Sequence, residues 1–102
     1  EQVTIIPIAE RHIEYAQSVY DVLKNMDIRA KLDDRSESMN YKIRDAQNKK
    51  VPYMLIIGDK EISESKVSVR ARSKGDIGSK EAGDFINQLK REIESRGKTV
   101  VE

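Results

Sequence analysis

Residues 51–72 read "VPYMLIIGDKEISESKVSVRAR", and this stretch decides the fold. Its first part contains "YMLIIG" (53–58), an almost continuous apolar run that is typical of a strand buried on both faces. Its last part, "VSVRAR" (67–72), alternates apolar and polar side chains, so an extended strand would place Ser68, Arg70 and Arg72 together on one face. The loop "DKEISES" separates the two runs, and the two strands are predicted to pair antiparallel.

The residues before this stretch predict a strand, a helix and a second strand. "VTIIPIA" (3–9) is rich in β-branched residues, which favours a strand. Residues 10–26 place apolar side chains at helical spacing, and "IRAKLD" (28–33) alternates as a half-exposed strand does. A strand, a helix and a strand within about thirty residues form a βαβ unit, whose strands are normally parallel.

The other segments complete a three-layer fold. "DDRSES" (33–38) is a loop in which Ser36 or Ser38 can cap a helix over 39–50, with Lys42 expected near the solvent. A short last strand is expected around Ile77 within 73–79, and an amphipathic helix over 80–97. The sequence therefore predicts one α/β domain over 1–102, a three-layer α/β/α arrangement with a mixed sheet of about five strands flanked by three helices.

Composition excludes several classes of function. The chain has 102 residues and a net charge of +1. It contains no cysteine, which excludes a disulfide framework and a thiolate metal site. The absence of cysteine suits a cytoplasmic protein. No run of apolar residues approaches the length of a membrane span. Because the chain starts at Glu1 without a methionine, we expect it to be a fragment of a longer protein.

Positive charge is concentrated in two central segments despite the balanced total. Residues 35–50 carry a net charge of +3 and residues 66–80 a net charge of +4. If the two segments meet in the fold, they form a basic patch.

Candidate catalytic and metal-binding residues are few. His12 is the only histidine and is expected to be exposed on the first helix, so His and Cys metal clusters are excluded by count. The pair Asp33 and Asp34 is interpreted as a solvated turn in preference to a cation site. No phosphate-binding glycine loop is present, so no catalytic residue is assigned.

The side chains most suited to ligand binding are basic. Arginine can donate two parallel hydrogen bonds to a guanine edge or to a phosphate. Glu61, just before the Arg70 strand, could accept hydrogen bonds from the Watson–Crick edge of an unpaired guanine. Taken alone, these residues leave two interpretations open, an RNA-binding face and a solvated surface on which Glu61 and Arg70 form an ion pair.

A resemblance to a known family favours the first interpretation. The motifs "DDRSES", "YKIRDAQ", "VPYMLIIGDKE" and "VSVRAR" resemble the C-terminal anticodon-binding domains of class II aminoacyl-tRNA synthetases, specifically those of threonyl-tRNA synthetases. The opening "TIIPIAERHIEYAQSVYDVLK" and the closing "FINQLKREI" are similar to the same domains, so the resemblance covers nearly the whole chain. It implies a mixed sheet flanked by helices that binds the tRNA anticodon loop and performs no catalysis.

The resemblance also implies roles for individual residues. Arg70 and Glu61 match the positions expected to read the anticodon, and Ser36 stands where the family typically has asparagine. Threonine anticodons share G and then U at their second and third positions, so we expect Arg70 and Glu61 to clamp the G and Ser36 to address the U. Phosphate contacts are expected from three further cations, Arg35, Lys42 and Arg72.

The resemblance extends to the parent protein. It implies a threonine–tRNA ligase that uses ATP, Mg²⁺ and a zinc ion held by a separate catalytic domain, with no cofactor in the present domain. The parent is expected to be a homodimer through its catalytic domain, and this chain alone a monomer. Two alternatives remain: the equivalent domain of a histidyl, prolyl or glycyl enzyme or of a synthetase-like accessory subunit, and an α/β protein-interaction or small-ligand domain that does not bind RNA.

Overall fold

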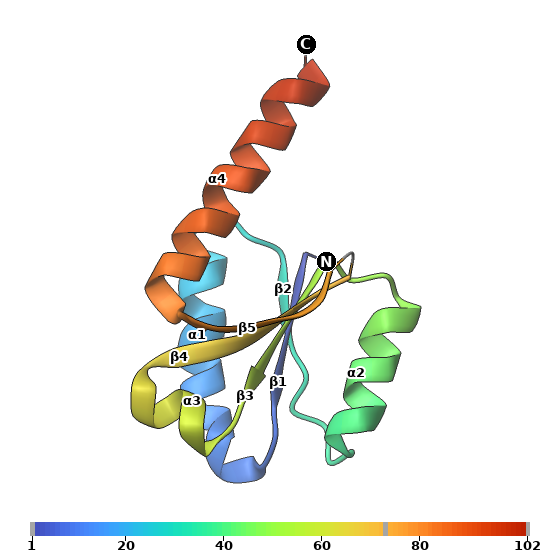
Figure 1. The fold of residues 1–102 in the computed structure, drawn as a ribbon, viewed down its shortest axis with the longest axis vertical. Coiled ribbons are helices and arrows are strands. Elements are labelled where there is room, and N and C mark those ends of the chain that lie inside the picture. Colours follow the sequence, from blue (N-terminus) through green and yellow to red (C-terminus); the bar gives the residue numbers. More distant parts are fainter. Residues whose placement is uncertain (1, 73, 102) are drawn as a thin grey trace.

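The fold is built on a single five-stranded sheet (Figure 1). A computed structural model describes residues 2–72 and 74–101, with side chains through Glu94, so Glu1, Ser73 and Glu102 of the predicted domain lie outside it. The strand order is β2-β1-β3-β4-β5. In chain order the strands are β1 (Val3–Pro7), β2 (Ala30–Leu32), β3 (Tyr53–Ile57), β4 (Lys66–Ala71) and β5 (Gly75–Glu81).

The sheet is mixed, as predicted. Strand β1 pairs in parallel with both β2 and β3, whereas β4 pairs antiparallel with both β3 and β5. Helix α1 (Ile13–Asn25), preceded by a 3-10 turn at Glu10–His12, connects β1 to β2, and α2 (Met39–Asn48) connects β2 to β3. These connections place the carboxyl ends of the three parallel strands at the same edge of the sheet.

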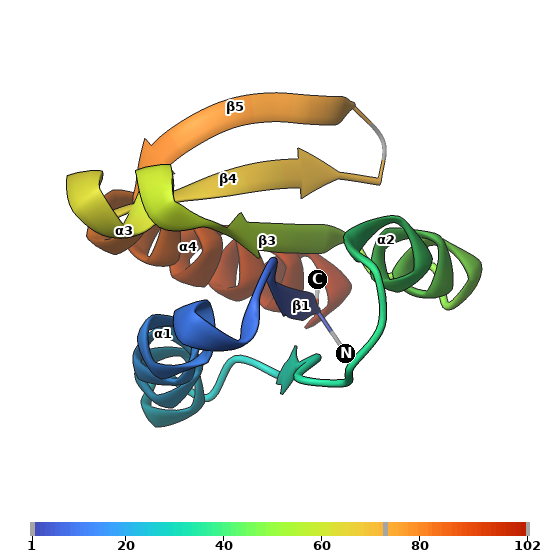
Figure 2. The same ribbon diagram turned by 90° about the horizontal axis from the view of Figure 1, so that it is seen from below.

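Helices cover the two faces of the sheet unequally (Figure 2). Helix α1 and the final helix α4 (Ala82–Val101) pack on one face, around a core that includes Leu23, Leu55 and Phe85. Helix α2 alone packs on the other face, where Ile43 and Ala46 contact residues of β1 and β3 such as Ile6 and Met54. The three-layer prediction is therefore confirmed.

The side of β4 that faces the α2 layer carries polar side chains. Val67, Val69 and Ala71 are buried on the opposite side of the sheet, whereas Ser68 and Arg70 alternate with them and are half-buried. The alternation predicted from "VSVRAR" is therefore present. It leaves a polar strip of sheet beside α2.

The structure corrects four expectations from the sequence. The predicted loop "DKEISES" contains a fourth helix, α3 (Asp59–Glu64), where three helices were expected. The last strand spans seven residues. His12 and Lys42 were expected to be exposed, but their side chains are buried, with 2% and 4% of their surface exposed.

No helix in the described part of the chain is long and apolar enough to cross a membrane.

Candidate nucleic-acid interface

Arg70 lies on the polar strip of the sheet with its guanidinium group available. It is directly opposite Met54 of β3, whose side chain belongs to the core under α2. A hollow of about 90 Å³ lies beside it, lined by Gln47, Val51, Met54 and Arg72 among others. Among the described residues, no side chain forms a hydrogen bond or ion pair with Arg70. This half-buried arginine is therefore free to bind a ligand.

The carboxylate that faces Arg70 across the β4–β5 ladder is engaged by a backbone hydrogen bond. The register between β4 and β5 shifts after Val69, so that Asp76 is opposite Arg70 and Ile77 is the extra residue. Gly78 adopts a φ of +89°, which suits glycine far better than other residues, and its N–H donates to Asp76 Oδ1 at 2.9 Å. The acidic side chain nearest to Arg70 in register is thus engaged with its own strand.

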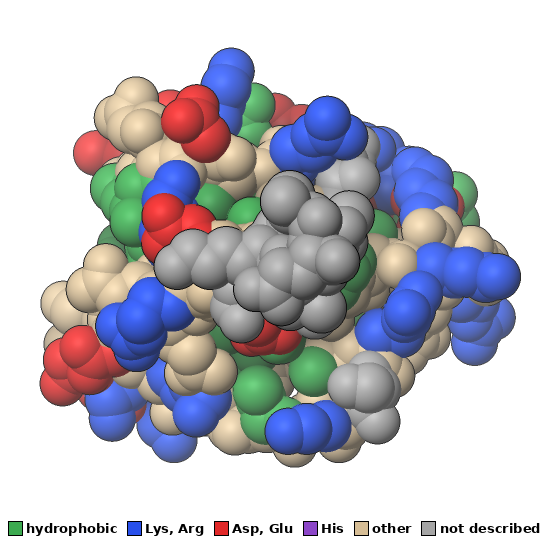
Figure 3. All heavy atoms as spheres, turned by 90° about the horizontal axis from the view of Figure 1, so that it is seen from above, with side chains coloured by type: hydrophobic (Ala, Val, Ile, Leu, Met, Phe, Trp, Pro, Cys, Tyr) green, Lys and Arg blue, Asp and Glu red, His purple; other side chains and the backbone are tan. Residues whose placement is uncertain are grey.

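Arg72 is exposed at the end of β4 and is anchored to the end of α2. Its Nη1 donates to the carbonyl oxygen of Lys50 at 3.2 Å, and its backbone N–H donates to the carbonyl oxygen of Pro52 at 2.8 Å. The two basic segments of the sequence therefore meet at this point. Figure 3 shows Lys and Arg side chains with few acidic ones on the α2 side of the molecule. The exposed cations there include Lys49, Lys50, Arg72 and Lys74.

Glu61 lies in the first turn of α3 and is partly committed to that helix. The N–H of Gly58, the residue that caps α3, donates to Glu61 Oε1 at 2.7 Å. The half-buried Glu61 carboxylate also contributes to raising the pKa of Tyr15, although burial of the tyrosine is the larger cause. The second carboxylate oxygen of Glu61 has no described partner.

The structure does not bring Arg70 and Glu61 together. Arg70 pairs with Met54 near the start of β3, whereas Glu61 is held at Gly58, just beyond the end of β3. Gly58 lies four positions beyond Met54 along an extended chain, which corresponds to ~13 Å. Among the described residues, the ion pair between Glu61 and Arg70 that the sequence left open is therefore not formed.

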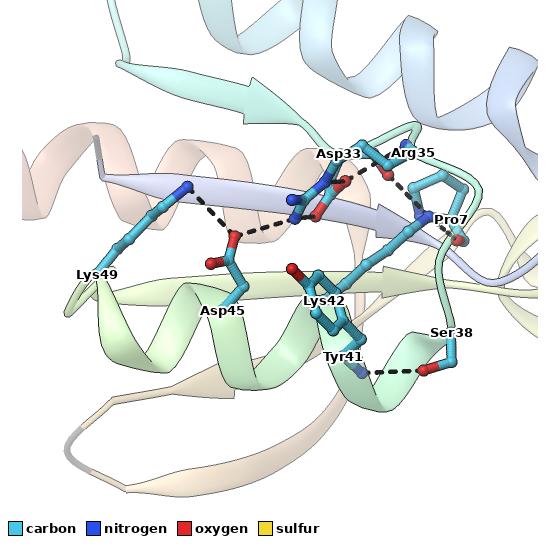
Figure 4. A network of polar contacts seen from close by, with 8 residues as sticks. All are labelled: Pro7, Asp33, Arg35, Ser38, Tyr41, Lys42, Asp45 and Lys49. Carbon is cyan, nitrogen blue, oxygen red and sulfur yellow. Dashed lines mark hydrogen bonds and ion pairs between the residues drawn. The ribbon is translucent and has the colours of Figure 1, made fainter.

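Arg35, in the β2–α2 loop, is bound by carboxylates from the loop and from α2 (Figure 4). Its Nε and Nη2 each donate to the buried Asp33 carboxylate at 2.8 Å, and Nη2 also donates to Asp45 at 2.9 Å. The guanidinium group lies 5.4 Å from the ring centre of Tyr41. Arg35 is the largest cause of the lowered pKa of Asp33. The side chain still has 40% of its surface exposed.

Lys42 performs a structural task at the same edge of the sheet. Its Nζ donates to the carbonyl oxygen of Asp33 at 3.0 Å and to that of Pro7 at 3.5 Å, which joins the ends of β1 and β2 (Figure 4). A buried ammonium group needs such partners because leaving water is costly for a charge. The expected position of Lys42 near the solvent is therefore wrong.

Ser36 is exposed above a pocket at the carboxyl ends of the parallel strands. The pocket has a volume of about 220 Å³, and its lining includes Ile8, Glu10, Arg35, Ser36 and Lys42. Ser38, and not Ser36, caps α2, because its Oγ accepts the N–H of Tyr41 at 3.1 Å. The Ser36 hydroxyl is thus left for other partners. In the described residues, no group of three His, Asp or Glu side chains is placed to hold a metal ion.

The Asp33 carboxylate is expected to make the stability of the protein depend on acid pH. Its pKa is lowered in the folded state, so unfolding at low pH takes up a proton. The stabilisation is present above the unfolded-state pKa of about 3.9 and is lost as the pH falls below it. We expect the unfolding free energy of an Asp33→Asn variant to vary less between pH 5 and pH 2, in urea titrations, than that of the wild type. Equal pH dependence of both proteins would contradict this assignment.

Comparison with known proteins places this architecture in one family. Residues 2–92 match the family model described as the anticodon binding domain. The chain is 54% identical to the threonine–tRNA ligase of Natranaerobius thermophilus over 93 residues, which are 91% of this chain and 15% of that protein. The chain therefore spans only about 15% of the length of the curated relatives it matches.

Two solved structures have the same fold. The RNA binding domain of threonyl-tRNA synthetase from Cryptosporidium parvum Iowa II superposes with a TM-score of 0.79 at 30% identity, over 86% of this chain and 22% of that one. Prolyl-tRNA synthetase from Cryptosporidium parvum, complexed with L-proline and AMP, superposes with a TM-score of 0.82 at 25% identity, over 92% of this chain and 21% of that one. By its sequence match and its fold, the chain belongs to the anticodon binding domain family.

Proposed function

We propose that this chain is the tRNA-recognition domain of a threonine–tRNA ligase and that it reads the G and U shared by threonine anticodons. The observation that carries the proposal is the unpartnered, half-buried Arg70 on a strip of sheet beside basic residues. Identity of about 50% to threonine–tRNA ligases supports the choice of tRNA.

The separation of the candidate residues suggests how two bases are shared among them. Arg70 binds the O6 and N7 atoms of an unstacked guanine with two hydrogen bonds. Glu61 and Ser36 lie toward the other end of the site and address the uracil. The free oxygen of Glu61 accepts the uracil N3–H, and the Ser36 hydroxyl donates to a uracil carbonyl oxygen. Ser36 offers a single hydroxyl where an asparagine would offer two separate atoms, so its contact is a single hydrogen bond.

Phosphates are contacted by cations around these bases. Arg72 and Arg35 are the proposed contacts, since both are exposed and each is held in place by protein groups. Lys42 acts on the RNA indirectly, because its ammonium group holds the loop that carries Ser36. The phosphate contacts of Arg72 and Arg35 fix the position of the anticodon loop without reading its sequence.

The function is tested by titrating the chain with anticodon stem-loop RNAs. The three loops carry GU at the second and third anticodon positions, the swapped pair UG, and the GG of proline anticodons. We expect the GU loop to bind most tightly. Preference for GG would assign the chain to a prolyl enzyme, whose fold it shares. Equal affinity for GU and UG loops, or no binding, would contradict anticodon reading.

Removing Arg72 is expected to weaken all of these loops to the same extent. A phosphate contact releases counterions, so Arg72→Ala should reduce the slope of log affinity against log salt concentration by ~0.7. The ratio of affinities for GU and UG loops should not change. A change in that ratio would show that Arg72 contacts a base.

The remaining proposals concern the protein of which this chain is a part. We propose a cytoplasmic ligase that uses ATP, Mg²⁺ and zinc in a separate catalytic domain and forms a homodimer through it. Its acceptor-stem contacts would add to the affinity of this domain, because linked sites bind the same tRNA.

A further inference from the structure

His12 lies in the 3-10 turn that follows β1, and its buried side chain faces the start of α3. Its Nδ1 lies 3.0 Å from the backbone nitrogen of Ala9, and its Nε2 lies 2.7 Å from Asp59 Oδ1. Because a backbone N–H can only donate, Nδ1 is the acceptor, and Nε2 carries the proton that is donated to Asp59. The ring therefore connects the backbone after β1 to the first residue of α3. The sequence prediction of an exposed histidine missed this contact.

Asp59 receives a second set of hydrogen bonds from Arg11. Arg11 Nε and Nη2 donate to its two carboxylate oxygens at 3.1 and 2.8 Å. This pair is exposed and adds little stability by itself. Together with His12, however, it fixes the orientation of the carboxylate, and Arg11 is the larger cause of the strongly lowered pKa of Asp59.

The turn held by Asp59 is the turn that carries Glu61. Asp59 and Glu61 both lie in the first turn of α3, and Glu61 bonds back to Gly58. The segment after β1 packs closely here, since a Cβ atom at Gly58 would lie 2.8 Å from Ile8 Cδ1 and 3.2 Å from Glu61 Oε1. A helix of only six residues is not stable by itself, so its orientation depends on these contacts.

We propose that Asp59, held by His12 and Arg11, is a positioning residue that orients the Glu61 carboxylate toward the third anticodon base. Asp59 does not contact the RNA in this proposal. The inference rests on the proposed function, in which Glu61 accepts a hydrogen bond from that base. It assigns a specificity role to three residues, His12, Arg11 and Asp59, to which the resemblance gave no role in reading the anticodon.

The test compares base preference at two positions. Stem-loops carrying GU, GC and AU at the second and third anticodon positions are titrated against the wild-type chain and Asp59→Ala. Cytosine N3 is an acceptor and cannot donate to Glu61, so we expect the GU-to-GC affinity ratio to fall ~5-fold or more when the contact to the third base is misplaced. The GU-to-AU ratio, which reports on Arg70, should stay at the wild-type value. Asp59→Asn should recover part of the lost preference, because its amide oxygen still accepts from His12.

Two controls separate the possible outcomes. Asp84→Ala removes an exposed acidic residue from the first turn of α4, on the face of the sheet away from α2 and the polar strip, and should change neither ratio. Glu61→Gln reports on the proposed function itself. If Glu61→Gln lowers the third-base preference and Asp59→Ala does not, the positioning role is refuted and the reading role of Glu61 stands. Positioning through Glu61 is also refuted by either of two other results. One is that Asp59→Ala lowers both affinity ratios, and the other is that Glu61→Gln changes neither affinity ratio.

Discussion

Arg70→Ala is expected to weaken binding of the GU stem-loop by ~1–3 kcal/mol, which is ~5- to 150-fold in affinity. The side chain is half-buried beside a hollow and has no described protein partner, so its hydrogen-bonding capacity is available to the base. The same substitution should reduce the preference for G over A at the second anticodon position. Fluorescence titrations with the two loops at one salt concentration measure both effects.

Two matched variants distinguish base reading from charge. Arg70→Lys keeps the positive charge but loses the planar fork, so we expect it to lose most of the preference for G while keeping part of the affinity. Arg91→Ala removes an exposed arginine from α4 on the other face of the sheet and should leave binding unchanged. If the Arg70→Ala protein keeps the wild-type ratio of affinities for G and A loops, Arg70 does not read the base.

Lys42→Met is expected to lower the free energy of unfolding by ~2–4 kcal/mol. The substitution keeps the apolar stem and removes the ammonium group, so the carbonyl oxygens of Asp33 and Pro7 lose its hydrogen bonds. Each buried acceptor left without a partner costs ~1–3 kcal/mol. Urea denaturation monitored by circular dichroism gives the free energy, and a fall in Tm of ~4–8 °C for each kcal/mol should accompany it.

Lys49→Met is the control for this substitution, because Lys49 lies just past the end of the same helix and is exposed. Its effect should stay within ~0.5 kcal/mol, as for most surface substitutions. A Lys42→Met protein as stable as this control would show that the buried ammonium group does not hold the ends of β1 and β2 together.

The sequence predicts the sheet and the place of Arg70 because strand alternation depends on local geometry alone. The positions of His12 and Lys42 depend on contacts between distant segments, and both were predicted wrongly. A signal was nevertheless present. Position 12 continues the stripe of buried residues Ala16, Val19 and Leu23, and position 42 lies on the stripe of Met39, Ile43 and Ala46. Polar residues on an apolar stripe indicate buried hydrogen bonds.

Helix α3 was missed for a different reason. Its residues are mostly polar and too few to show a helical period, so they resemble a loop. The available signal was the glutamate three residues after Gly58, which suits a capping box. The distance between Glu61 and Arg70 could not be predicted from the sequence either, because it depends on the register of β4 against β3.

The bulge between β4 and β5 also shapes the exposed edge of the sheet. Strand β5 is the last strand of the sheet, and an edge strand with unpaired backbone groups invites another chain to extend the sheet. The extra residue Ile77 and the positive φ of Gly78 interrupt the regular ladder, and Asp76, Lys80 and Glu81 place charges along the same strand. The irregularity that places Asp76 opposite Arg70 thus also makes the sheet edge a poor template for intermolecular β-sheet growth.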